Sequence, residues 1–308
     1  ITRVETFGLH FATLDIRQES SVHGKVIKAL LQKGSTLQLQ LLDAAQYTSV
    51  DAADEEMVTE TINSIKAIKT IHRFNGAMGC HRYIISQCNS ANNVLEVAEL
   101  CLLSGFTKDD LHIDIVPLFE TIDDLQQAAA VMQQLYTNSF YKQHLSKRNH
   151  KQTIMLGFSD GTKDGGYLMA NWRIYKAKEQ LTSIAKQNNI DVVFFDGRGG
   201  PPSRGGGKTH KFYASMGKNI AGKEIQVTVQ GQTVSSNYGT VDSAQYNMEQ
   251  LINAGITNQL NNDKKITLGK EGEYLLQSLA EESLQKYLSL KNHPGFMNYL
   301  LQVSPLRF

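Results

Sequence analysis

Residues 153–166 read TIMLGFSDGTKDGG, and this stretch decides the fold class. A short apolar run ends at Gly157, polar and glycine residues follow, and a helical pattern takes over near residue 164. The same succession recurs at 192–200, VVFFDGRGG, ahead of a second glycine-rich loop. Apolar strands that alternate with helices are typical of a buried parallel sheet. The sequence therefore predicts an α/β fold.

The alternation extends along most of the chain. We expect strands at 10–18, 82–87, 113–120, 153–160, 192–200 and 225–231. We expect helices at 54–72, 91–104, 123–136, about 164–188 and 242–254, and a helical pattern from about 270 onward. Strand ends spaced by about 30 to 40 residues are typical of a barrel or of a doubly wound sheet, and only the strand order separates these two folds.

We expect a TIM-type (β/α) barrel, incomplete in this chain, with additional helices. No linker or charge block divides the chain, so residues 1–308 are predicted to form a single domain. Its strands and helices would occupy residues 1–255 and a helical part residues 256–308. The chain begins at Ile1 and runs almost at once into an apolar stretch, which suggests a piece of a longer protein.

The composition of the chain restricts the classes of binding partner that we expect. The formal net charge is only +1, which argues against nucleic acid, and no apolar run approaches the ~18 residues of a membrane span. The three cysteines, Cys80, Cys88 and Cys101, fit neither a zinc knuckle nor a disulfide framework. We therefore expect a reducing, cytoplasmic location with no membrane contact.

The loop at 197–210, GRGGPPSRGGGKTH, contains six glycines, two arginines and a lysine. It is not a P-loop, because Pro202 stands where that motif requires glycine. Glycines permit close approach of the backbone, and the planar groups of Arg198 and Arg204 suit phosphate or carboxylate. We predict an anion-binding loop; the alternative is a surface loop with solvated charges.

Two carboxylates follow neighbouring predicted strands. Glu120 ends the strand at 113–120 and Asp160 ends the strand at 153–160. Such a pair can hold Mg²⁺ or Mn²⁺, with the remaining positions left to water and substrate. The alternative for Asp160 is a helix cap, a role that Thr162 could share. Thr121 resembles the start of a capping box, which does not explain a glutamate before it.

Other polar side chains also follow predicted strands, and a parallel barrel would gather all of them at one end. They are Arg17, Ser86, Gln87, Lys163 and Gln230.

Five ordered motifs resemble the phosphoenolpyruvate carboxylase family across essentially the whole chain. They are LDIRQES (14–20), VPLFET (116–121), GFSDGTKDGG (157–166) with the helix YLMANWRIYKAKEQL, GRGGPPSRGGGKTH (197–210) and VTVQGQ (227–232). The resemblance implies conversion of phosphoenolpyruvate and bicarbonate to oxaloacetate and phosphate, through carboxyphosphate and an enolate that a divalent metal stabilises. It also implies that the full-length protein is a homo-oligomer, a tetramer.

The resemblance implies roles for the matching residues. Glu120 and Asp160 resemble the ligands of Mg²⁺ or Mn²⁺. The catalytic residues would be Lys163 near bicarbonate, Arg198 and Arg204; the substrate-binding residues would be Arg17 and Arg198, which hold phosphate, and Gln230. Arg204 matches a glycine-loop arginine that can also contact an acidic inhibitor.

The chain departs from the family pattern in several places. It has no TAHPT-like segment with the catalytic histidine and no GSRP-x-K segment, so we expect it to be inactive alone. Asp196 stands where many members have histidine, and Leu301 stands where YFR has arginine. Two alternatives stay open: an unrelated barrel enzyme that binds a phosphorylated carboxylic acid, and a non-catalytic descendant.

Overall fold

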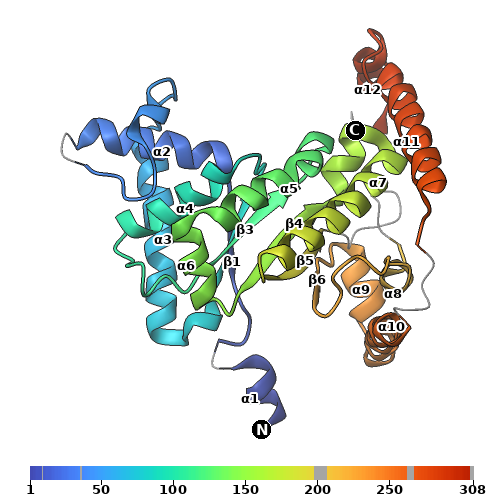
Figure 1. Ribbon diagram of the computed structural model, residues 1–308, viewed down its shortest axis with the longest axis horizontal. Coiled ribbons are helices and arrows are strands. Elements are labelled where there is room, and N and C mark those ends of the chain that lie inside the picture. Colours follow the sequence, from blue (N-terminus) through green and yellow to red (C-terminus); the bar gives the residue numbers. More distant parts are fainter. Residues whose placement is uncertain (9, 35–36, 198–206, 262–266, 306–308) are drawn as a thin grey trace.

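Six parallel strands form one sheet in the order β1-β2-β3-β4-β5-β6 (Figure 1). The computed structural model describes residues 1–308 apart from 9, 35–36, 198–206, 262–266 and 306–308. The strands are β1 (Asp15–Glu19), β2 (Arg82–Ser86), β3 (Asp114–Phe119), β4 (Lys151–Gly157), β5 (Asp191–Gly197) and β6 (Ile225–Val227). The predicted α/β class is confirmed, and neighbours along the chain are neighbours in the sheet.

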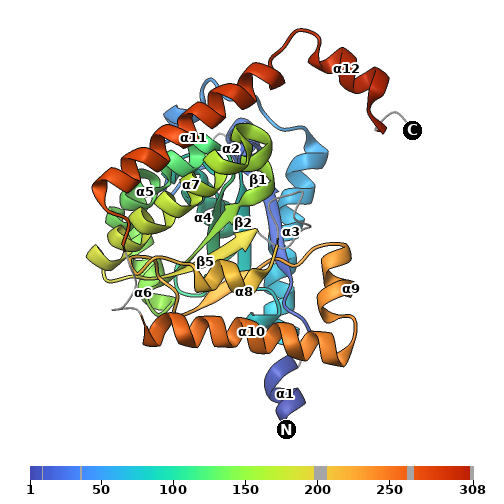
Figure 2. The same cartoon turned by 90° about the vertical axis from the view of Figure 1, so that its right-hand side faces the viewer.

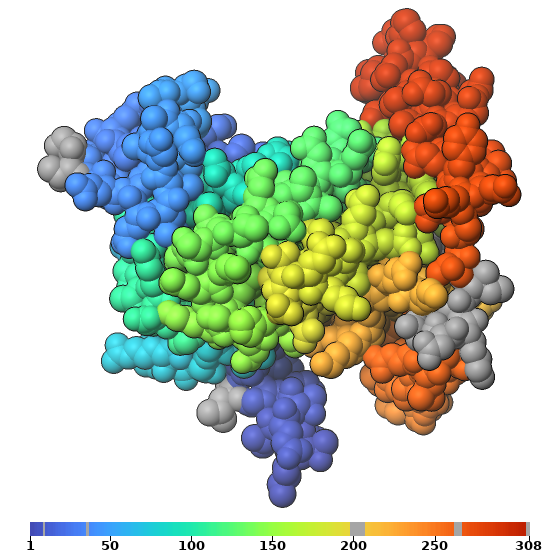
Figure 3. Space-filling model, in the orientation of Figure 1, coloured from blue at the N-terminus to red at the C-terminus, as the bar shows by residue number. Residues whose placement is uncertain are grey.

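Helices connect the strands and continue after β6. They are α1 (Thr2–Phe7), α2 (Ser20–Lys33), α3 (Glu55–Asn75), α4 (Ala91–Leu103), α5 (Ile122–Thr137), α6 (Ser139–Lys147), α7 (Phe158–Gln187), α8 (Thr209–Ala214), α9 (Gln232–Tyr238), α10 (Val241–Leu260), α11 (Lys270–Lys291) and α12 (Phe296–Val303), with short 3-10 turns η1 (Ala44–Tyr47) and η2 (Ala77–Gly79). In Figure 3, α5, α6 and α7 cover the middle of the molecule, and α11 and α12 project to one side. None of the helices described here has both the length and the hydropathy for a bilayer crossing.

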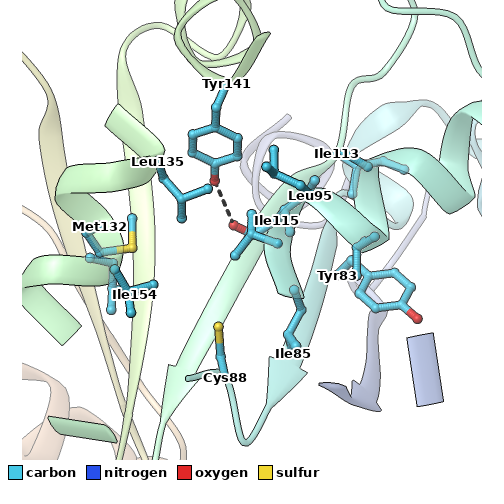
Figure 4. Packing of buried hydrophobic residues seen from close by; sticks show 14 of the residues in the cluster. Tyr83, Ile85, Cys88, Leu95, Ile113, Ile115, Met132, Leu135, Tyr141 and Ile154 are labelled. Carbon is cyan, nitrogen blue, oxygen red and sulfur yellow. Dashed lines mark hydrogen bonds between the residues drawn. The ribbon is translucent and has the colours of Figure 1, made fainter. Parts of the chain in front are cut away.

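The two faces of the sheet pack differently, because successive strand side chains point to opposite sides. On one face, Tyr83, Ile85, Ile115 and Ile154 meet the helices in the main core, as the close view in Figure 4 shows. On the other face, strand side chains pack with one another in a smaller cluster. Its members are Ile84, Val116, Leu118 and Met155, with Phe195 against them.

Three predicted strand boundaries are wrong, and one of them is the end of β6, which stops at Val227 and not at residue 231. β1 starts at Asp15 rather than at residue 10, because the residues before it bond to η2: the Thr13 hydroxyl donates to the Met78 carbonyl at 2.9 Å and the Leu14 amide to the Gly79 carbonyl at 2.9 Å. β4 stops at Gly157, and residues 158–160 belong to α7. The sequence pattern also missed α1, α2, α6, α8 and α9.

The long helix α7 begins at Phe158, before the predicted start near 164, because it consists of two helical segments that join at Gly166. Gly166 lies between them with φ 78° and ψ 168°, which is not helical. Only glycine adopts this backbone without strain. The sequence GTKDGG looked like a loop, and the structure makes it a helical turn that ends in a kink.

Candidate active site

Two of the predicted site residues, Arg17 and Glu120, contact one another near the carboxyl ends of their strands. Arg17 lies in β1 and Glu120 directly follows β3, and the structure brings the two together although 103 positions separate them. Arg17 Nη2 donates to Glu120 Oε1 at 3.0 Å. The Arg17 side chain is half exposed and that of Glu120 is 9% exposed. A nearly buried carboxylate thus lies under a cation that still reaches solvent.

Glu120 also bonds to the end of β2. The backbone amide of Gln87 donates to Glu120 Oε2 at 3.2 Å, and Gln87 has a positive φ of 52°. Burial raises the pKa of Glu120, the Gln87 amide and the Arg17 charge lower it, and the charges of Asp160 and Asp124 raise it; the net direction is upward. Asp160 is thus near enough for its negative charge to raise the pKa of Glu120.

Two glycines leave room for Glu120 between β3 and α7. A Cβ atom at Gly157 would lie 3.0 Å from Glu120 Cγ and 3.3 Å from Glu120 Cα. A Cβ atom at Gly161 would lie 3.1 Å from the Glu120 carbonyl oxygen. The distances at Gly157 are shorter than ordinary contacts between carbon atoms, which begin near ~3.5 Å, and the distance at Gly161 from Cβ to the carbonyl oxygen is also tight. The sequence motif GFSDG is therefore partly explained by close packing against Glu120.

Asp160 and Lys163 form an ion pair in the first turns of α7. Lys163 Nζ donates to Asp160 Oδ1 at 2.6 Å, and both side chains are exposed. The capping alternative is not what the structure shows: the N-cap is Gly157 without a side-chain cap, and the Thr162 hydroxyl bonds to the Phe158 carbonyl. Asp160 therefore has an exposed carboxylate that is not engaged in capping.

The neighbouring helix start does use a side-chain cap. Thr121 and Asp124 form the predicted capping box at the start of α5. The amide of Ile122 bonds instead to Asp164 Oδ2 at 3.0 Å, which ties the first turn of α5 to α7. Thr121 and Asp124 exchange the hydrogen bonds of this capping box, and the Glu120 amide also donates to Asp124 Oδ2 at 3.4 Å.

Helix α11 supports the turn that carries Lys163, and the sequence analysis missed this contact. The Tyr287 hydroxyl and Lys291 Nζ donate to the Lys163 carbonyl at 2.8 and 3.2 Å. Figure 2 shows α11 lying along α7. Gly166 approaches the Tyr287 ring so closely that a Cβ atom would lie 3.2 Å from it. The paired glycines at 165–166 were the only sequence signal for this approach.

The donor set fits Mg²⁺ or Mn²⁺. Within the part of the chain that the structure describes, no cluster of three or more His, Cys, Asp or Glu side chains could form an all-protein cage. Mg²⁺ commonly takes one or two carboxylates and leaves its other positions to water and substrate. The carboxylates of Glu120 and Asp160 are oxygen donors of this kind, one nearly buried and hydrogen-bonded and one exposed.

The remaining predicted residues lie elsewhere or outside the description. Arg198 and Arg204 fall outside the described residues. Gln230 is exposed between β6 and α9, and no contact within the described ranges joins its side chain to the residues above. Leu301 is 62% exposed on α12. Asp196 is buried on the helix side of β5, where it pairs with Lys178.

The fold and these side chains define an α/β protein whose charged groups gather at the carboxyl ends of parallel strands, where this class binds its ligands. The sequence profile of the phosphoenolpyruvate carboxylase family matches residues 1–307. The chain belongs to that family.

Individual relatives agree with this assignment. The chain is 33% identical over 331 residues to phosphoenolpyruvate carboxylase of Prochlorococcus marinus strain MIT 9312, an alignment that covers 99% of the chain and 33% of the relative. It is 32% identical over 328 residues to the protein of that name from Corynebacterium diphtheriae, with 98% and 36% covered. The chain thus spans about a third of the length of the curated relatives it matches.

Proposed function

We propose that this chain supplies the phosphate- and metal-binding edge of a phosphoenolpyruvate carboxylase. The reaction would join bicarbonate to phosphoenolpyruvate and give oxaloacetate and phosphate. The observation that carries the proposal is the contact between Arg17 and the nearly buried Glu120, with the Asp160–Lys163 pair at the adjacent strand end. Family membership supports it independently.

The charges of these residues suit the reaction. Phosphoryl transfer from phosphoenolpyruvate to bicarbonate needs cations at the phosphate oxygens, and arginine can bind them through two nitrogens. We assign this role to Arg17 and Arg198, with Gln230 as a further substrate-binding residue. Lys163 and Arg204 complete the proposed catalytic set, Lys163 on the bicarbonate side.

We assign Glu120 and Asp160 as ligands of Mg²⁺ or Mn²⁺, which would stabilise the negative charge of the enolate. In the structure, each carboxylate is paired with a cation of its own, Arg17 or Lys163. Exchange of these ion pairs on metal binding would release both cations toward an anionic substrate. Binding of the metal would in this way increase the affinity of the same site for the substrate.

Purified full-length protein from the gene that encodes this chain tests the proposal. Bicarbonate-dependent formation of oxaloacetate, coupled to NADH oxidation, should require Mg²⁺ or Mn²⁺ and should stop on addition of a chelator. Glu120→Gln should lose nearly all activity, because metal binding needs the charged carboxylate. Glu19→Gln, at a partly exposed strand position without an assigned ligand role, is the control. A folded protein that binds phosphoenolpyruvate and does not convert it would indicate the non-catalytic descendant.

We also propose that the 308-residue chain alone is inactive. The proposed reaction needs a proton acceptor, and loss of a general base typically costs ~10²–10⁴-fold in rate. The histidine segment expected from the family is missing from these residues. Turnover by the isolated chain within about tenfold of the full-length protein would contradict this.

The order of the strands supports the proposal of a (β/α) barrel. A doubly wound sheet places later strands on the other side of the first, whereas barrel strands follow one another in order. The apolar cluster on the face away from the helices would then belong to the barrel interior. A cytoplasmic location and tetrameric assembly of the full-length protein complete the proposal, and the three buried free cysteines are compatible with a reducing compartment.

A further inference from the structure

Three buried side chains contact one another in space, although two of them precede the glycine-rich loop in the sequence and the third follows it. Asp196 lies in β5, Lys178 in α7 and Tyr213 in α8. Lys178 Nζ is 2.7 Å from Asp196 Oδ1 and donates to Asp196 Oδ2 at 2.8 Å. The Tyr213 hydroxyl donates to Asp196 Oδ2 at 2.7 Å. Along the chain, Asp196 precedes segment 198–206 and Tyr213 follows it.

Aromatic rings surround the lysine of this cluster. Lys178 Nζ lies 5.1 Å from the ring centroids of both Phe194 and Phe212 and 5.9 Å from that of Tyr213. The side chains of Lys178 and Asp196 are 2% and 0% exposed. The charges are therefore compensated within the protein and hold one geometry.

Stability alone does not account for a buried ion pair at this position. Taking two charges out of water is costly, and replacement of such pairs by apolar residues is often neutral or stabilising. What the pair supplies is a fixed position for the Asp196 carboxylate, which also accepts the hydrogen bond from Tyr213 of α8. This matters for α8, because its six residues are too few for a stable helix without tertiary contacts.

The end of β5 is also placed tightly. A Cβ atom at Gly197 would lie 3.0 Å from the Leu156 carbonyl oxygen of β4. The amide of Thr228 donates to the Asp196 carbonyl at 3.0 Å, which joins the end of β6 to the same residue. Asp196 is thus held through its backbone by the sheet and through its side chain by α7 and α8.

We propose that Asp196, Lys178 and Tyr213 form a clasp that fixes the two positions between which segment 198–206 is attached. They would act as positioning residues for the end of β5 and the start of α8, the two described elements that flank this segment in the sequence. This inference rests on the proposed function for its catalytic consequence. The clasp also gives Asp196 a role of its own where many family members have histidine.

Tyr213→Phe in the full-length protein is the sharpest test, because it removes one hydroxyl and leaves the ion pair intact. We expect the kcat to fall by about tenfold or more, since displacement of a reacting group by ~1 Å can cost about 10²-fold. Amide hydrogen exchange in α8 should become faster by about tenfold, because the helix loses its tie to β5.

Tyr141→Phe is the matched control. Tyr141 is fully buried, and its hydroxyl donates to Gln152 Oε1 at 2.8 Å, far along the chain from the clasp. It should lower thermal stability by a similar amount and leave kcat and α8 exchange within twofold of wild type. A second variant, Lys178→Met with Asp196→Asn, removes both charges and keeps an acceptor for Tyr213, so we expect it to retain more activity than Tyr213→Phe.

Two results would overturn the clasp: unchanged α8 exchange in Tyr213→Phe, or an equal loss of kcat in Tyr141→Phe. If the wild-type protein does not convert phosphoenolpyruvate, the proposed function fails and the exchange measurement still decides whether the clasp exists. If exchange changes and kcat does not, the positioning role is wrong.

Discussion

Gly157→Ala tests how closely the protein controls the position of Glu120. Gly157 has φ −90° and ψ 118°, which alanine adopts without strain. The only direct consequence is a new methyl group, 3.0 Å from Glu120 Cγ and 3.3 Å from its Cα and Cβ. Because the backbone of Glu120 is among the crowded atoms, rotation of the side chain cannot relieve the contact fully.

The size of the effect follows from these distances. Carbon atoms pack at about 3.5–4.0 Å, so Glu120 Cγ must retreat by roughly 0.5–1 Å. Overpacking of this kind typically costs ~1–3 kcal/mol, and alanine recovers ~0.5–1 kcal/mol in a strand. We expect a net loss of about 1–2 kcal/mol in the free energy of unfolding. We expect kcat/KM and Mn²⁺ affinity to fall by at least about tenfold, since ~1 Å of displacement can cost about 10²-fold.

Urea unfolding, Mn²⁺ titration and the coupled oxaloacetate assay measure these quantities. Gly255→Ala is the control, because a Cβ atom at Gly255 in α10 meets nothing within 4 Å. It should stabilise the helix by up to ~1 kcal/mol and leave activity unchanged. If Gly157→Ala binds Mn²⁺ and turns over substrate within twofold of wild type, the reasoning about Glu120 is refuted.

Three further predictions follow from single contacts. The Arg17 charge lowers the pKa of Glu120, so Arg17→Met should raise that pKa further. On acidification, the variant should then lose Mn²⁺ affinity at a higher pH than the wild type. An unchanged pH midpoint in Mn²⁺ titrations would contradict this. Gly166→Ala should lower the free energy of unfolding by at least ~1–2 kcal/mol, because φ is +78° and the new Cβ atom would lie 3.2 Å from the Tyr287 ring. Gly76→Ala, with φ +80° and open space around the Cβ position, measures the cost of the backbone conformation alone. Equal losses for the two variants in urea unfolding would exclude an effect of the ring contact. Burial lowers the pKa of His23 from 6.5 to about 4, so its protonation favours the unfolded chain; stability present above pH 6.5 should fall toward pH 4 by roughly 3 kcal/mol, and His23→Gln should flatten that slope.

Much of the element order could be predicted because it is a local property. The apolar runs of β2, β3 and β5 and the periodicity of α3, α4 and α5 are within a few residues of their predicted bounds. The predicted end of α4 also agrees with Gly105, which has φ +96° just after the helix ends. The prediction failed where a distant partner decides the backbone, as at residues 10–14, whose hydrogen bonds go to η2.

Recognition of the candidate site was possible for a related reason. In a parallel sheet, residues that follow strands share one edge, so the sequence could predict that Glu120 and Asp160 lie at the same edge, and their pairing on a metal stays a prediction. The identity of each partner could not be predicted. That Arg17 bonds to Glu120, and that Tyr287 supports the Lys163 turn, depends on elements 103 and 124 positions apart.

The sequence by itself determined the alternation of strands and helices, the family and the residues that carry charge at strand ends, because these depend on residue type and spacing. The tertiary structure alone decided the strand order, the burial that raises the pKa of Glu120 and the pairing of Asp196 with Lys178. The physical reason is desolvation: a carboxylate has its ordinary properties in water, and only the packing of distant segments determines how much water it keeps.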